Sequence, residues 1–187
     1  MDAFSYLSVL LSIVLGLAIT QVLQGLGRIL QERARTRMYW PAIAWAVLLL
    51  VIFVQTWWAM FGLRNVAHWS FAAFAVVILH VTVLYLLAAL VLPDPGREGE
   101  IDLRANYYAH ARAFFSVAVA ATVVSLMKDL VLTGGLPRVE NTGFHLFFML
   151  VGIASASTQR EWFHKLQTAA MACAFGLYIA LLFTQLH

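Results

Sequence analysis

Polar and ionisable side chains interrupt several long apolar runs of this sequence, and these are the residues whose types could do chemistry. His80 lies near the middle of the run 70–92, flanked by Leu79 and Val81. An imidazole at such a position hydrogen bonds to a neighbouring helix, here through Gln55, or relays protons, or ligates haem or a metal ion. The sequence leaves these roles open.

A second polar group lies near the end of the run 103–132. Asp129 shares a helical face with Thr122 and Ser125, which predicts a polar path toward that end. Lys128 is adjacent, and neighbouring helical positions point about 100° apart, so we expect the two charges not to pair directly. Lys128 is instead expected to snorkel to the boundary of the apolar region.

A third pattern is a stripe of small and polar residues at four-residue steps in the first run. The stripe consists of Ser8, Ser12, Gly16, Thr20 and Gln24. We expect this helical face to pack against protein, either as a close helix contact or as one wall of a polar conduit. The full set of residues predicted to line a polar pathway is Ser12, Thr20, Gln24, Gln55, His80, Thr122, Ser125 and Asp129.

Cations and aromatic side chains meet at the start of the run 103–132. Arg104, Tyr108 and Arg112 recur at four-residue steps, with His110 beside them. This patch is typical of contact with anionic lipid headgroups. A sharper alternative is a site for a phosphorylated or acidic ligand.

The elements that must position these side chains are membrane helices. The 187 residues are 63% hydrophobic and 11% charged, whereas soluble domains are about one quarter charged. Spans of about 20 apolar residues use nearly the whole length and leave no room for a soluble domain. The sequence predicts a single transmembrane domain over residues 1–187, with an all-α fold of six transmembrane helices. We expect them at about 4–30, 40–63, 70–92, 103–132, 143–158 and 164–186.

Local signals define the ends of these helices. Pro41 suits the first turn of the second helix, and Ser70 and Asp102 are expected N-caps of the third and fourth. Gly134 is expected to end the fourth helix. Asn141 or Thr142 is expected to cap the fifth helix, which is short for a full span.

Basic residues separate between the two sides of the predicted bundle. Nine fall on one side, namely Arg28, Arg33, Arg35, Arg37, Arg97, Arg104, Arg112, Arg160 and Lys165, against Arg64, Lys128 and Arg138 on the other. The positive-inside rule then predicts that both termini lie on the outer side of the membrane. This distribution accounts for the net charge of +3 without nucleic acid as a partner.

Several common chemical motifs are missing from the sequence. It contains no Walker loop, GxGxxG turn, GxSxG elbow, HExxH pair or selectivity-filter segment. The single cysteine, Cys173, excludes an intramolecular disulfide. We therefore predict no catalytic residue, metal site or cofactor, and the sequence disfavours an enzyme.

Three stretches carry a resemblance to known proteins. They are LGLAITQVLQGLGRIL, then YWP with the later QTWWAMFGLR, then YLLAALVLPD followed by GEIDLRANYYAHARAFF. Over most of its length the chain resembles a family of small, functionally uncharacterised bacterial inner-membrane proteins. The resemblance implies a six-helix, multi-pass protein of the cell inner membrane, which would make the outer side periplasmic. It implies no catalytic or binding residue.

The start of the chain carries a second resemblance, to bacterial six-helix relatives of the lysosomal potassium channel. The first helix of that family opens with an AFSDG-type motif, whereas here Ala3, Phe4 and Ser5 are followed by Tyr6. That family also places its N-terminus inside, opposite to the side that the basic residues predict here. The resemblance serves as an analogy for a conduit.

The polar side chains on otherwise apolar helices favour one function. We predict an oligomeric channel or transporter-like conduit for protons, ions or a small solute. The alternatives are a non-transporting accessory or scaffold subunit, which packs through the small-residue face of the first helix, and a haem- or lipid-handling membrane protein. The expected partners are membrane lipids with anionic headgroups and either further copies of the chain or a larger membrane complex.

Overall fold

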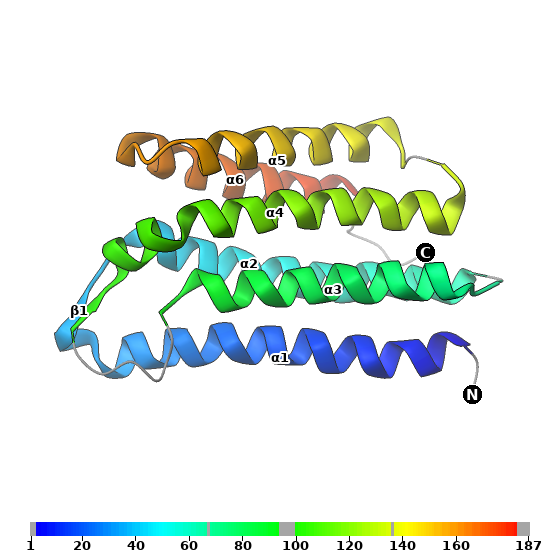
Figure 1. The fold of residues 1–187 in the computed structure, drawn as a ribbon, viewed down its shortest axis with the longest axis horizontal. Helices are drawn as coiled ribbons and strands as arrows, with labels where there is room; N and C mark the ends of the chain where they lie inside the picture. Colours follow the sequence, from blue (N-terminus) through cyan, green and yellow to red (C-terminus); the bar gives the residue numbers. More distant parts are fainter. Residues whose placement is uncertain (1–2, 67, 94–99, 136, 183–187) are drawn as a thin grey trace.

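Helices make up almost all of the chain that the computed structural model describes, which is residues 3–66, 68–93, 100–135 and 137–182. The long helices run side by side along one common direction (Figure 1). They are α1 (Ala3–Gln31), α2 (Trp40–Met60), α3 (Phe71–Val91), α4 (Leu103–Thr133), α5 (Val139–Ser157) and α6 (Glu161–Leu182). The predicted all-α class is confirmed.

Five of these helices are long and apolar enough to cross a membrane. The candidate spans are Phe4–Gln31, Trp40–Asn65, Phe71–Val91, Leu103–Thr133 and Val139–Ser157. A sixth span and the side on which the termini lie stay predictions. Arg97 and the end of the predicted sixth helix, 183–186, lie outside the described residues.

The expected caps are found at three helix ends. The side chain of Ser70 accepts a hydrogen bond from the Ala73 N–H at 3.1 Å, and that of Asp102 accepts one from the Ala105 N–H at 2.8 Å. Both cap predictions are therefore confirmed. Gly134 ends α4 in the left-handed conformation at φ 73°, which glycine adopts without steric cost, as predicted.

The predicted start of α5 is wrong. The helix begins at Val139, after Arg138, and not after Asn141 or Thr142. The Thr142 hydroxyl instead donates to the Pro137 carbonyl at 3.1 Å. The Thr142 N–H donates to the Arg138 carbonyl at 2.9 Å, so the backbone is already helical at the two residues that were expected to cap it.

The two ends of the bundle differ. Two short 3-10 helices, η1 (Arg33–Arg35) and η2 (Phe61–Asn65), lie in the connections that follow α1 and α2. Strand β1 (Thr36–Arg37) pairs in parallel with β2 (Ile101–Asp102). We call the end that holds these strands the β end, and the opposite end, where η2 and the α4–α5 connection lie, the η2 end (Figure 1).

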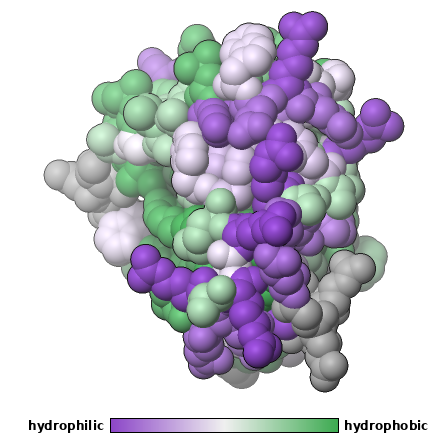
Figure 2. Space-filling model, turned by 90° about the vertical axis from the view of Figure 1, so that its left-hand side faces the viewer, coloured by the Kyte–Doolittle hydropathy of each residue, from purple (hydrophilic) through white to green (hydrophobic). Residues whose placement is uncertain are grey.

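The β end is strongly polar. Figure 2 looks onto it and shows hydrophilic side chains gathered across the face. Arg37 reaches across the strand pair, with its Nε donating to a Glu100 carboxylate oxygen at 2.8 Å. The pairing ties the segment after α1 to the segment before α4, and the sequence analysis did not predict it.

Helix α1 packs only on one side of the bundle, away from α5 and α6. α1 lies against α3 and α2, and its buried residues are Leu7, Leu11, Leu15, Ala18, Val22 and Ile29. α4 packs on both α3 and α5, closely at Gly152, where an added Cβ would lie 2.8 Å from Val119 Cγ2. Because α6 packs on α5 and α2, helices α2 to α6 surround a common space.

Candidate functional site

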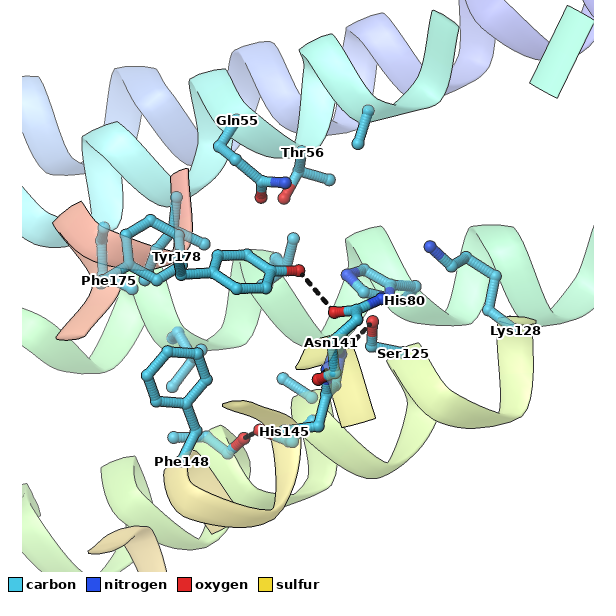
Figure 3. Close-up of a pocket in the computed structure, with 18 of the residues that line it drawn as sticks. Gln55, Thr56, His80, Ser125, Lys128, Asn141, His145, Phe148, Phe175 and Tyr178 are labelled. Atoms are coloured by element: carbon cyan, nitrogen blue, oxygen red, sulfur yellow. Dashed lines mark hydrogen bonds between the residues drawn. The ribbon is translucent and has the colours of Figure 1, made fainter. Parts of the chain in front are cut away.

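A cavity of about 420 Å³ lies among helices α2 to α6. Pockets that bind small molecules commonly have volumes of about 300–1,000 Å³. The lining is mostly aliphatic and aromatic, but polar side chains gather in it toward the η2 end (Figure 3). These polar residues are Gln55, Thr56, His80, Thr122, Ser125, Lys128, Asp129, Thr133, Asn141, His145 and Tyr178.

The cavity unites most of the residues predicted for a polar pathway. Five of them line it, namely Gln55, His80, Thr122, Ser125 and Asp129. Ser12, Thr20 and Gln24 of α1 do not line it and are exposed on the outside of the bundle. The expectation that their stripe packs against protein does not hold within the chain, because α1 turns its leucine face toward α3.

A hydrogen-bonded network joins α4, α5 and α6 in the cavity wall. His145 Nδ1 lies 2.8 Å from the Asn141 carbonyl oxygen, which only accepts, so Nδ1 carries the hydrogen and Nε2 accepts. The Ser125 hydroxyl therefore donates to His145 Nε2 at 3.1 Å. The Tyr178 hydroxyl donates to the Asn141 side chain at 3.1 Å (Figure 3). Ser125 and His145 thus fix each other's orientation, and so do Tyr178 and Asn141.

Sequence reasoning did not place Asn141, His145 or Tyr178 in the pathway. The four-residue step between Asn141 and His145 was the available signal, because it puts both on one face of a helix. Because α5 begins at Val139 and not at about Gly143, His145 lies in its second turn, where it lines the same cavity as His80.

Lys128 and Asp129 form an ion pair, contrary to the expectation that they do not pair. Lys128 Nζ lies 3.2 Å from Asp129 Oδ1, and each side chain is 23% exposed. The flexible four-carbon stem of lysine overcomes the angle between the two Cα–Cβ directions. Among the described residues, Lys128 and Asp129 are the charged side chains that line the cavity, and they balance each other.

His80 is buried in the wall, with 8% of its surface exposed. Its Nδ1 has no hydrogen-bond partner among the described residues, and no bond joins it to Gln55, the predicted partner. Buried polar atoms are nearly always paired, so a single orphan calls for a specific explanation. Its position in the lining supplies one, because a bound molecule could meet it there.

Toward the β end the cavity stops at a buried layer that we call the floor, formed by Trp45, Tyr107, His164, Gln167 and Thr168. Trp45 Nε1 donates to Thr168 Oγ1 at 3.1 Å, which joins α2 to α6. The Tyr107 hydroxyl lies 3.0 Å from His164 Nδ1, which joins α4 to α6. The rings of Phe114 and Phe115 pack edge-on against Trp45.

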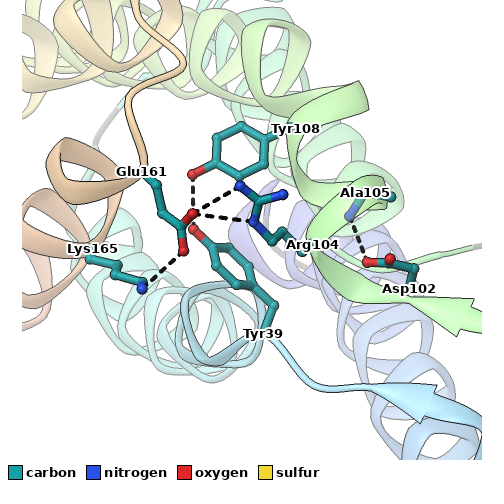
Figure 4. A network of polar contacts seen from close by, with 7 residues as sticks. All are labelled: Tyr39, Asp102, Arg104, Ala105, Tyr108, Glu161 and Lys165. Atoms are coloured by element: carbon teal, nitrogen blue, oxygen red, sulfur yellow. Dashed lines mark hydrogen bonds and ion pairs between the residues drawn. The ribbon is translucent and has the colours of Figure 1, made fainter.

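Beyond the floor, ion pairs and phenol groups tie the same helices together at the β end (Figure 4). Arg104 of α4 donates to a Glu161 oxygen at 2.8 Å, and Lys165 pairs with the other Glu161 oxygen at 2.9 Å. These two cations hold the pKa of the Glu161 carboxyl below its usual range, with Lys165 the larger cause. The hydroxyls of Tyr39 and Tyr108 lie 2.9 Å apart.

The residues predicted for a lipid-headgroup or anion patch have different surroundings. Arg104 is engaged by Glu161, and Tyr108 by Tyr39. His110 Nδ1 bonds to the backbone carbonyl of Asn106 at 3.0 Å, and Arg112 is exposed. The Arg104 guanidinium also lies over the Tyr108 ring, at 5.3 Å. The contact with lipid stays a prediction.

No family model, curated protein or solved structure matches the chain. Within the described ranges, no three His, Cys, Asp or Glu side chains are grouped to hold a metal ion. The helices and the cavity define the class of protein: an all-helical protein, with five helices suited to a membrane and a solute-sized cavity among them.

Proposed function

We propose that this protein is a transporter-like conduit of the cell inner membrane, which binds a small solute in the cavity and passes it between the two ends of the bundle. The observation that carries the proposal is the cavity of about 420 Å³, polar toward the η2 end and stopped by the floor toward the β end. Alternating access requires a central site that is closed toward one side of the membrane at a time, and the floor would provide that closure toward the β end.

The placement in the membrane follows from the helices and the basic residues. Helices α1 to α5 cross the bilayer, and α6 crosses with its apolar part, 166–182, which is close to the lower limit of about 17 residues for a span. The arginine-rich β end faces the cytoplasm. The η2 end and both termini face the periplasm.

Passage through the β end requires α6 to move away from α2 and α4. The floor bonds of Trp45 and Tyr107 and the Arg104–Glu161 ion pair all join α6 to those two helices. The Arg104–Glu161 pair is exposed, and a single hydrogen bond between membrane helices contributes about 0.6 kcal/mol on average, so each of these bonds can break and re-form. The floor is thus the inner gate of the proposed conduit.

The test is solute flux into liposomes that contain the purified protein, measured for protons, potassium and small neutral solutes. Ala118 lines the cavity, whereas Ala120 on the same helix faces outward. We expect flux above empty liposomes in the wild type, a loss of that flux in Ala118→Phe, and retention of it in Ala120→Phe. The proposal fails if the wild type gives no flux in several lipids and pH values, or if the two variants behave alike.

A second candidate function, a docking subunit of a larger assembly, is favoured by the outer face of α1. Ser12, Thr20 and Gln24 are exposed there, and an added Cβ at Gly16 meets no atom within 4 Å. Polar groups on a membrane helix favour contact with another helix over contact with lipid. Gly16→Leu should weaken an oligomer or a co-purifying complex, and a wild type that is monomeric and alone in mild detergent would exclude this role.

A further inference from the structure

The hydrogen bonds of the floor determine which of its atoms donate a hydrogen and which accept one. His164 Nε2 lies 2.9 Å from the backbone carbonyl of Thr158, which only accepts, so Nε2 carries the hydrogen and Nδ1 is an acceptor. The Tyr107 hydroxyl, 3.0 Å from His164 Nδ1, must then donate to it. The Tyr107 oxygen has only lone pairs left for any further partner.

Thr168 is constrained in the same way. Its hydroxyl donates to the His164 carbonyl at 2.7 Å, so its oxygen also offers only lone pairs. Gln167 Nε2 lies 3.2 Å from this oxygen and 3.4 Å from the Tyr107 hydroxyl. Because both neighbours accept, the amide nitrogen of Gln167 has to face them.

The amide oxygen of Gln167 consequently has no hydrogen-bond donor among these neighbours. Gln167 lines the cavity and is 4% exposed, and its Oε1 is buried without a hydrogen-bond partner. An amide oxygen only accepts. A residue of the cavity lining therefore holds an unpaired acceptor in the floor, and a donor on a molecule in the cavity would satisfy it.

Three described side-chain atoms are buried without a hydrogen-bond partner, namely Gln167 Oε1, His80 Nδ1 and Trp69 Nε1. Of their residues, Gln167 and His80 line the cavity, and Asn141 belongs to the same lining as His80. Tyr178, which bonds to Asn141, and Gln167 are eleven residues apart on α6, or about 16 Å along its axis. Leu49, Ala121 and Met171 lie in the lining between the floor and the polar region, and so does Thr122, whose hydroxyl donates to the Ala118 carbonyl of its own helix at 3.0 Å. A hydroxyl would satisfy His80 in either tautomer, because it both donates and accepts.

Charge narrows the class of solute further. Lys128 and Asp129 are the charged side chains of the lining, and they pair with each other at 3.2 Å. A solute with a net charge would lose its hydration without meeting an opposite charge that is free to bind it. The lining thus suits an uncharged molecule.

We propose that the cavity binds an uncharged amphiphile with a hydrogen-bond donor at each end and an apolar middle, a diol or a hydroxy-amide in chemical class. One end donates to Gln167 Oε1, the other meets His80 Nδ1, and the apolar middle lies against the wall between them. This inference rests on the proposed function only in taking the cavity as a solute site.

The experiment uses the full-length protein in lipid nanodiscs and straight-chain diols with a hydroxyl at each end. Binding is followed as the rise in melting temperature with ligand concentration, against the mono-alcohol of the same chain length. We expect one chain length at which the diol binds at least about tenfold more tightly than the mono-alcohol, since only the diol satisfies both orphans.

Gln167→Met keeps the side-chain length and removes the acceptor, so it should lower the affinity for the diol to that for the mono-alcohol. The control is Gln24→Met, the same change on the exposed face of α1, which should leave the preference intact. The inference is overturned if the wild type binds the diol and the mono-alcohol equally at every chain length, which is the result expected if water satisfies the unpaired atoms. It is also overturned if Gln167→Met still prefers the diol. If Gln167→Met does not fold, the wild-type comparison decides.

The flux measurement separates the two proposals. Diol binding in a protein that moves no solute would refute transport and keep this inference. Flux of other solutes, blocked by Ala118→Phe, with no preference for diols would keep transport and refute this inference.

Discussion

Thr168→Val isolates the hydrogen bonds of the floor, because valine has nearly the shape of threonine and lacks only the hydroxyl. Thr168 is 1% exposed, and its oxygen accepts from Trp45 Nε1 at 3.1 Å and from Gln167 Nε2 at 3.2 Å. The substitution leaves the Trp45 N–H without an acceptor in a residue that is 3% exposed. Gln167 keeps its longer contact with the Tyr107 hydroxyl, at 3.4 Å.

The expected loss follows from that single orphaned donor. Leaving a buried donor unpaired costs about 1–3 kcal/mol, and one interhelical hydrogen bond in a membrane protein contributes about 0.6 kcal/mol on average. We therefore expect Thr168→Val to lower the free energy of unfolding by about 2 kcal/mol. The loss should be visible by circular dichroism as a shift of the unfolding midpoint when the protein is titrated with denaturing detergent in mixed micelles.

Thr82→Val is the matched control. The Thr82 hydroxyl donates to the Ile78 carbonyl of its own helix at 2.9 Å and is exposed, so its loss should change stability by less than about 0.5 kcal/mol. If Thr168→Val costs no more than Thr82→Val, the floor bonds do not form as described. The orientation of the Gln167 amide, which depends on them, would then be wrong as well.

Two further perturbations act at the ends of the helices. Gly134→Ala should lower the free energy of unfolding by about 1 kcal/mol in the same titration, because the backbone φ is 73° at this residue. Gly135→Ala should lower it by less, and equal losses would contradict the left-handed cap. The lowered pKa of the Glu161 carboxyl, caused by Lys165 and Arg104, stabilises the fold above the ordinary carboxyl pKa of about 4.3. That stabilisation is lost as the pH falls through the lowered pKa, so the melting temperature should fall in acid. It should fall less steeply in Glu161→Gln, and identical acid profiles of the two proteins would refute this role of Glu161.

Local sequence signals were sufficient for the helices. Long apolar runs are unambiguous, and caps such as Ser70, Asp102 and Gly134 act within a few residues of themselves. The β1–β2 pairing was out of reach because its partners are far apart in sequence and each strand has only two residues. The start of α5 was misplaced because two capping residue types fell inside the first turn of the helix.

The site was predicted less well than the fold, and for a physical reason. Helical periodicity tells which residues share a face, but not which neighbour that face meets. Ser12 and Thr20 share a face, as helical periodicity predicts, and that face points outward. Gln55, His80 and Asp129 line one cavity only because α2, α3 and α4 pack around the same space. The unpaired oxygen of Gln167 depends on the side chains of Tyr107, His164 and Thr168 as well as its own, and these come from two helices, α4 and α6. No spacing rule contains that information.

The position of α1 bears on both proposed functions. No described residue of α1 lines the cavity, and α3 lies between α1 and α4 (Figure 1). Substitutions at sites that share no contacts usually have additive effects, so changes on the α1 stripe should leave solute binding unaltered, and changes in the cavity should leave assembly unaltered. Docking through α1 and conduction through α2 to α6 are therefore compatible in one chain, and a variant such as Gly16→Leu separates them.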